Sequence, residues 1–181
     1  LNMILKCEVS RHSRGNLIFS DNCGNLAYTS EYVRSMPKRS VIYLKDKNEN
    51  FLYWIMKKSQ KFRNEYIIDD FVSGKPLYAY YKGKKIYIFI EKELSPLILK
   101  WHIIKKNFEV YLGSESILTA FSKGMFSFEY TMEFQSEKYK DLCICLTTVL
   151  FDLLTNEFIS SKIRNGFLNM EIGRASCRER V

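Results

Sequence analysis

The feature that most constrains the fold is a short stretch near the C-terminus that is apolar on almost every side. The stretch LCICLTTVLFDLL (Leu142–Leu154) follows Asp141 and contains a single charged residue, Asp152. A helix with no polar face has to be buried all round, and Asp141 would complement the positive end of its dipole. The run is shorter than the roughly 20 residues that a membrane span needs. We therefore predict a buried helix over about 139–155. Within it, four side chains should be almost fully buried: Leu146, Val149, Leu150 and Leu153.

The sequence before this helix predicts a series of β-strands, and these could form the wall that buries the helix. Its clearest segment is FSFEYTMEF (Phe126–Phe134), where apolar and polar residues alternate and give one dry and one wet face. Similar runs bring the count to about twelve strands: Met3–Val9, Asn16–Asp21, Leu26–Val33, Val41–Lys45, Phe51–Lys57, Glu65–Asp69, Leu77–Tyr81, Lys85–Glu91, Leu97–Ile104, Asn107–Leu112, Ile117–Ser122 and Phe126–Phe134. The predicted fold is mainly β, an antiparallel closed barrel of about twelve strands around one hydrophobic C-terminal helix. Closure would leave no free sheet edge. The alternative is an open sheet whose helix is covered by a partner subunit.

Turn residues separate these runs. DNCGN (Asp21–Asn25) and DKNEN (Asp46–Asn50) place Asp and Asn where their side chains can bond the local backbone. KGKK (Lys82–Lys85) offers Gly83 for a tight hairpin. The first two turns also begin a weak internal repeat, DNCGNLAYTSEYV and DKNENFLYWIMKK. Short strands separated by regular turns favour a barrel or a sandwich over alternating β and α units.

The order of these segments resembles the LURP-one-related family, a branch of the tubby C-terminal superfamily. The segments that carry the resemblance are LIFSDNCGNLAYTS, VIYLKDKNENFLYWIMKK, NEYIID, WHIIKKNFEVYLG and the closing DLCICLTTVLFDLL, which together cover roughly Met3 to Thr155. The second turn departs from the family pattern, because Glu49 stands where glycine is usual, and we expect only a local effect. The resemblance implies a tubby-like barrel of twelve strands with a central helix. It also suggests membrane association, because tubby proteins bind phosphoinositide headgroups and the related scramblases associate with membranes.

The two ends of the sequence are expected to differ from the native protein. Ile172–Val181 reads IGRASCRERV, and this string resembles the in-frame translation of a common sequencing adapter. We therefore expect one domain over residues 1–170, with residues 171–181 not native, and Met3 as a candidate start. Removing Ile172–Val181 takes away three arginines and one glutamate, which lowers the net charge from +8 to +6. The basic character is thus mostly a property of the domain.

Basic residues gather near three predicted strand ends and are the candidate site for an anion, either a lipid headgroup or a nucleic acid. They are Lys57, Lys58, Lys61 and Arg63; Lys82, Lys84 and Lys85; and Lys105 and Lys106. The alternative is that these lysines only keep the hairpin ends soluble and unpaired. Aromatic residues beside Lys82–Lys85 would also suit single-stranded nucleic acid, but tyrosine is a favoured strand residue, so we do not expect nucleic acid.

The sequence does not predict catalysis. It has no nucleophile elbow, phosphate-cradling glycine loop or HExxH motif. The two histidines, His12 and His102, are far apart, and His102 is expected to be packed among apolar neighbours. A pairing of either with Cys7 or Cys23 is the remaining catalytic alternative. The cysteines show no metal-ligand spacing, so we predict no metal, no cofactor and no enzyme activity.

The leading hypothesis is a non-enzymatic binding domain at an anionic phospholipid surface. A structural or protein-interaction domain with a protein partner is the alternative, and a carrier that opens its barrel for an apolar ligand is a third. The chain shows no cleavable signal peptide and no transmembrane segment. Free cysteines in apolar surroundings point to a reducing compartment. We expect a cytoplasmic protein, peripheral to a membrane if the leading hypothesis holds.

Overall fold

The computed structural model describes residues 3–10, 16–35, 39–58, 65–102, 104–124 and 129–155. Within these ranges the chain forms twelve strands and one helix of residues 140–155. The strands are β1 (Met3–Val9), β2 (Leu17–Asp21), β3 (Leu26–Ser35), β4 (Arg39–Asp46), β5 (Phe51–Lys57), β6 (Glu65–Asp70), β7 (Pro76–Lys82), β8 (Lys85–Ile88), β9 (Leu97–His102), β10 (Asn107–Leu112), β11 (Glu115–Ser122) and β12 (Glu129–Phe134).

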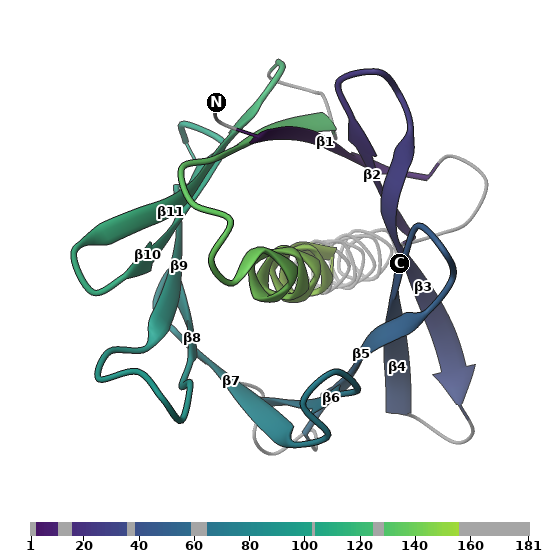
Figure 1. Cartoon of the computed structure of the whole chain (residues 1–181), viewed down its shortest axis with the longest axis vertical. Helices are drawn as coiled ribbons and strands as arrows, with labels where there is room; N and C mark the ends of the chain where they lie inside the picture. The colour runs from purple at the N-terminus through teal and green to yellow at the C-terminus, as the bar shows by residue number, and fades with distance from the viewer. Residues whose placement is uncertain are drawn as a thin grey trace, which may run out of the picture. The chain divides into compact units, whose positions relative to one another are not determined.

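The twelve strands form a closed antiparallel barrel (Figure 1). Each strand pairs with its neighbours in the sequence, and β1 closes the ring against β12, with Met3 opposite Phe134. This order explains the period-two pattern, because alternate residues of every strand face the inside of one ring. The predicted fold class is therefore confirmed.

The inside of the barrel is apolar along almost every strand. In β10, for example, Phe108, Val110 and Leu112 are buried, while the residues between them are partly exposed. The same alternation runs through β6 and β9. The polar exception among the buried strand residues is Ser30, whose hydroxyl accepts a hydrogen bond from the Leu17 amide at 2.9 Å. The inward residues thus supply a continuous dry lining.

The helix begins inside this lining, at the centre of the ring of strands (Figure 1). The four positions expected to be buried are 0–4% exposed: Leu146, Val149, Leu150 and Leu153. The two threonines on the helix are also buried, because Thr147 and Thr148 donate their hydroxyls to the carbonyls of Cys143 and Ile144, four residues earlier, at 2.8 and 2.9 Å. A buried hydroxyl with a partner costs far less than one without, which lets the helix be apolar on every face.

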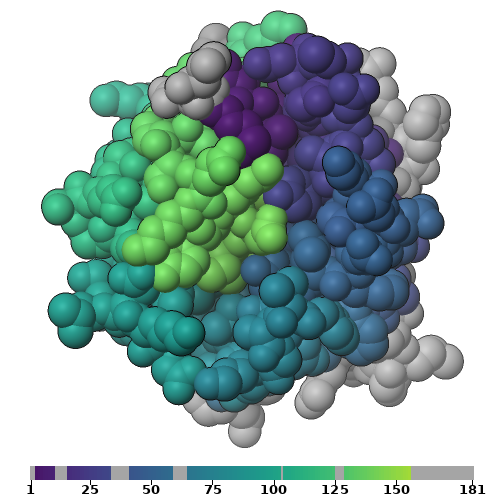
Figure 2. Space-filling model, viewed as in Figure 1, coloured from purple at the N-terminus to yellow at the C-terminus, as the bar shows by residue number. Residues whose placement is uncertain are grey.

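Three polar contacts hold the start of the helix and the two residues before it against the barrel. The Tyr28 hydroxyl, from β3, donates a hydrogen bond to Asp141 Oδ1 at 2.6 Å. Just before the helix, the Tyr139 hydroxyl donates a hydrogen bond to the Glu93 carboxylate. The same carboxylate forms an ion pair with Lys138 at 2.9 Å. In space-filling view, light-green atoms of the chain after β12, which includes the start of the helix, lie in the mouth of the ring at this end (Figure 2). Asp141 therefore combines a favourable charge in the first helical turn with an anchor to the barrel.

The two turns of the internal repeat have the same structure. Asp21 accepts hydrogen bonds from the amides of Cys23 and Asn25 and from the side chain of Asn25. Asp46 makes the equivalent bonds to the amides of Asn48 and Asn50 and to the Asn50 side chain. These bonds to the ionised carboxylate, with the Asn side chain as the main cause, lower the pKa of both Asp21 and Asp46 below the usual 3.8.

The fourth residue of each of these turns has a left-handed backbone. Gly24 has a φ of 84° and Glu49, at the matching place in the second turn, has a φ of 63°. Glycine adopts this conformation without steric cost, whereas a residue with a Cβ does not. The departure from the family pattern at Glu49 is therefore a strained backbone position and not a different turn.

Most predicted strand bounds differ from the observed ones by no more than two residues, as for β3, β4 and β11, and two strands end earlier than expected. The strand expected over Lys85–Glu91 ends at Ile88, and the one expected over Leu97–Ile104 ends at His102, so Ile104 lies in a turn. In both places, apolar residues follow the strand end in the sequence, so the pattern predicts a longer strand. Two of these residues are exposed instead: Phe89 is 66% and Ile104 is 96% exposed. Phe126 and Phe128 lie outside the described residues.

The internal contacts divide the chain into two compact units, Leu1–Val149 and Leu150–Val181. The prediction of one domain over residues 1–170 stays a prediction, and residues 171–181 lie outside the described part of the chain. No helix in the described ranges is both long enough and apolar enough to cross a membrane.

Candidate functional site

The up-and-down strand order sorts the loops between the two ends of the barrel. The last residues of β1, β3, β5, β7, β9 and β11 lie at one end, and the last residues of the even-numbered strands lie at the other. All three predicted lysine groups follow odd-numbered strands: β5, β7 and β9. They therefore lie at the same end, which we call the lysine end.

The described loops of the lysine end, counted together with the strand-terminal residues that flank them, carry eight lysines and two glutamates. The lysines are Lys57, Lys58, Lys82, Lys84, Lys85, Lys105, Lys106 and Lys123. Lys61 and Arg63, the other two predicted site residues, lie outside the described residues. The loops of the opposite end, the acidic end, counted in the same way with the terminal residues of the flanking strands and helix, carry eight carboxylates and five lysines within the described ranges. Charge is thus segregated along the barrel.

Some of these lysines are engaged within the protein. Lys58 forms an ion pair with Glu65 at 3.0 Å, and Lys123 lies 3.8 Å from Glu129. Lys57 sits over the Tyr66 ring, with its Nζ 5.8 Å from the ring centroid. Both glutamates of the lysine end are thus paired with a lysine. The remaining lysines leave this end with an excess of positive charge.

Four lysines are exposed and make no side-chain hydrogen bond or ion pair with any described residue: Lys82, Lys84, Lys85 and Lys105. Lys82, Lys84 and Lys85 belong to the β7–β8 hairpin, which reverses at Gly83 with a φ of 63°. Lys105 belongs to the β9–β10 hairpin. The two hairpins are two strands apart, so about 10 Å separates them. That spacing allows both to contact one anionic surface.

A second candidate site lies on the outer wall and was missed at the level of sequence. Tyr43, Trp54 and Asp69 are paired across β4, β5 and β6, and Phe71 follows in the next turn. The ring centroids of Tyr43 and Phe71 are each 5.0 Å from that of Trp54. Aromatic residues on two neighbouring strands, β4 and β5, and in the turn after β6 were the available signal, but they become neighbours only once the register is known.

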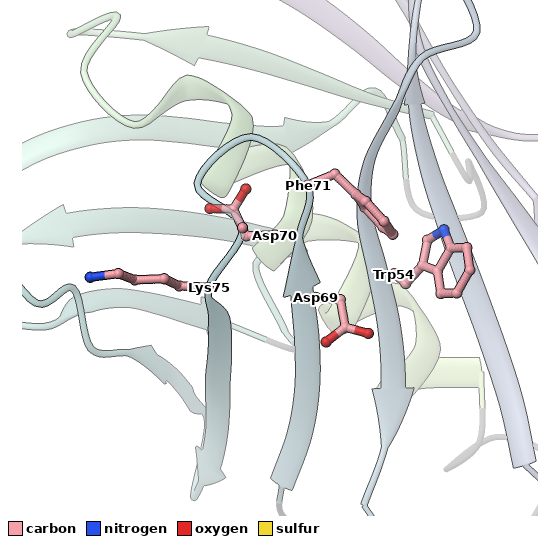
Figure 3. A pocket seen from close by; sticks show the side chains of 6 residues that line it. Trp54, Asp69, Asp70, Phe71 and Lys75 are labelled. Carbon is pink, nitrogen blue, oxygen red and sulfur yellow. The ribbon is translucent and has the colours of Figure 1, made fainter.

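This aromatic cluster borders an open cavity of about 280 Å³ (Figure 3). Its lining includes Trp54, Asp69, Phe71 and Lys75. The Asp69 carboxylate makes no hydrogen bond with any described residue, whereas Asp70 accepts hydrogen bonds from the Val72 and Ser73 amides and shapes the turn. The cavity is open to solvent and partly apolar, which suits a protein side chain better than a small substrate.

The alternative of a Cys–His pair finds no support among the described residues. Cys7 is fully buried, and burial raises the pKa of its thiol far above its ordinary value, so it is held as a thiol. Burial likewise raises the pKa of Cys143 to about 12. Cys23 is exposed and unpaired, and His12 lies outside the described residues.

His102 was expected to be packed, and this was wrong, because it is exposed at the last position of β9. Apolar neighbours in a strand do not bury a side chain that points outward at the strand end. Within the described ranges, no group of three or more His, Cys, Asp or Glu residues is arranged to hold a metal ion.

No family model matches the chain, and no curated protein matches it. Among solved structures, the chain is similar to the X-ray structure of a protein from Arabidopsis thaliana, with a TM-score of 0.59 and 15% sequence identity. The match covers 83% of this chain and 91% of that chain. At this identity the likeness shows a shared fold, and the chain is thus a twelve-stranded closed barrel with one C-terminal helix, built like that plant protein.

Proposed function

We propose that this chain is a non-enzymatic binding domain of the LURP-one-related, tubby-like kind, which docks peripherally on anionic phospholipid surfaces through its lysine end. The observation that carries the proposal is the gathering of eight lysines against two glutamates at one end of the barrel. Four of these lysines are free of partners among the described residues. The sequence resemblance to a membrane-associated superfamily supports the same reading.

The magnitude is sufficient for docking. A lysine near an acidic membrane contributes roughly 1 kcal/mol, so the four free lysines together supply about 4 kcal/mol. That corresponds to nearly a thousandfold in the binding constant. The attraction is screened over about 8 Å at physiological ionic strength, so binding should weaken as salt is added. No headgroup pocket is required, and selectivity for charge should precede selectivity for a particular headgroup.

The test is co-sedimentation with phosphatidylcholine vesicles that contain or lack phosphatidylserine. The triple variant Lys84→Gln, Lys85→Gln, Lys105→Gln should bind acidic vesicles roughly a hundredfold more weakly than the wild type. Its matched control is Lys47→Gln, Lys75→Gln, Lys92→Gln, which removes the same charge from the acidic end. This control should bind like the wild type. Equal losses in the two triple variants would mean that only net charge matters and would reject docking through the lysine end.

A protein partner is the second candidate, and the partly exposed aromatic cluster of Tyr43, Phe51, Trp54 and Phe71 is the observation that favours it. Phe51 and Phe71 are 44% and 48% exposed, and large aromatic side chains of this kind often anchor protein interfaces. Under this reading the variant Phe71→Ala would lose the partner in a pull-down, while vesicle binding by the lysine end would be absent.

A further inference from the structure

Ile104 occupies an unusual place in the lysine end. It lies in the turn between β9 and β10 and is 96% exposed, with Lys105 and Lys106 directly after it. Single exposed apolar residues are common on protein surfaces, so exposure alone carries no meaning. The surroundings distinguish Ile104, because its side chain projects from the same end as the unpaired lysines.

The turn that presents Ile104 is held by the barrel. Lys106 has a φ of 48°, which reverses the chain tightly after Ile104. The Lys106 carbonyl accepts a hydrogen bond from the Ser122 amide at 3.1 Å, and this ties the turn to the end of β11. At the start of β10, Asn107 pairs with His102 of β9 and with Phe121 of β11, and Phe121 is itself 42% exposed. A second apolar side chain therefore belongs to the strand end beside the turn.

We propose that Ile104 enters the apolar layer of the membrane when the lysine end docks, while Lys105 and the lysines of the β7–β8 hairpin contact the headgroups. The inference rests on the proposed function and adds a role that charge alone does not supply. Lysine side chains hold their charge among headgroups and cannot reach the acyl region without loss of hydration. A branched aliphatic side chain gains free energy by leaving water. The β9–β10 hairpin would combine an apolar side chain that enters the membrane, Ile104, with a charged side chain that contacts the headgroups, Lys105, in adjacent residues.

The acidic end provides an internal control. Leu94 is as exposed as Ile104, at 108%, but it follows Glu93 in the β8–β9 loop of the acidic end. An acidic membrane repels this end, so Leu94 should stay in water. The two residues are of the same size, both are almost fully exposed, and they differ in the charge around them.

The test compares Ile104→Ser with Leu94→Ser in the full chain, using phosphatidylcholine vesicles that contain phosphatidylserine. Burial of one branched aliphatic side chain corresponds to roughly a tenfold change in affinity. Ile104→Ser should therefore bind about tenfold more weakly at every salt concentration, with an unchanged salt dependence. Leu94→Ser should bind like the wild type. By contrast, the triple lysine variant should flatten the salt dependence, since it removes charges.

A spectroscopic arm reports insertion directly. Ile104→Trp should show a blue shift in its added tryptophan emission on acidic vesicles, and Leu94→Trp should show none. If Ile104→Ser binds like the wild type while the triple lysine variant loses binding, the membrane role of Ile104 is rejected and docking by the lysines stands. If the wild type fails to bind acidic vesicles at all, both proposals fall.

Discussion

Replacing Glu49 by glycine should stabilise the protein. Glu49 has a φ of 63°, and Gly24 at the matching place in the first turn has a φ of 84°. A left-handed backbone costs a residue with a Cβ about 1–2 kcal/mol. Glycine removes this strain but raises the entropy of the unfolded chain by about 0.4–1 kcal/mol. The net gain expected for Glu49→Gly is roughly 0.5–1 kcal/mol. The amide of residue 49 keeps its hydrogen bond to the Asp46 carbonyl, so the turn itself is unchanged.

The assay is urea unfolding, in which Glu49→Gly should raise the midpoint while the slope stays constant. The matched control is the reverse change, Gly24→Glu, in the first turn. No atom lies within 4 Å of the position that a Cβ would take at Gly24, so its cost should be the backbone strain of about 1–2 kcal/mol. A lower midpoint for Glu49→Gly would refute the reasoning, because it would mean that the Glu49 side chain stabilises the fold through a contact that outweighs its strain.

Two further predictions concern the core and the turns. Leu146→Ala should lower the free energy of unfolding by about 2–5 kcal/mol, because Leu146 is fully buried in the helix, and a loss below about 1 kcal/mol in the same urea assay would place the side chain outside the core. For the turns, the folded-state pKa values of Asp21 and Asp46 lie below the usual 3.8, so their contribution to stability is present above about pH 4 and is lost as the pH falls. The double variant Asp21→Asn, Asp46→Asn should therefore lose less stability than the wild type between pH 6 and acid, and parallel curves would contradict this.

Most of the fold could be predicted because its two strongest patterns are local. Period-two alternation marks each strand, and the all-apolar stretch Leu142–Leu154 requires a wall around it. Strand ends were harder, as Ile104 illustrates. Ile104 is apolar and follows the apolar residues of β9, so the sequence suggests that the strand continues. The turn is placed by the pairing of His102 with Asn107, and this pairing cannot be read from the sequence.

The site was only partly predictable for a related reason. The lysines could be grouped by the turns that they flank, but their placement at one end follows from the strand order. Hairpins after β5, β7 and β9 share an end only if every strand pairs with its neighbour in the sequence. Predicting the aromatic cluster would have required the strand register as well as the strand order, because Tyr43 and Trp54 become neighbours only through the register of β4 with β5.

The closure of the ring between β1 and β12 has a consequence for how the chain folds. All other strand pairs are formed by neighbours in the sequence, so they can assemble one after another as the chain leaves the ribosome. The last pairing joins Met3 to Phe134, and the helix that fills the ring follows it. Until then the growing sheet has two unpaired edges and an apolar face without a core, a state prone to association with other chains. Folding should therefore have a late, slow step governed by this long-range contact, and the ends of the domain should control its rate more than its middle.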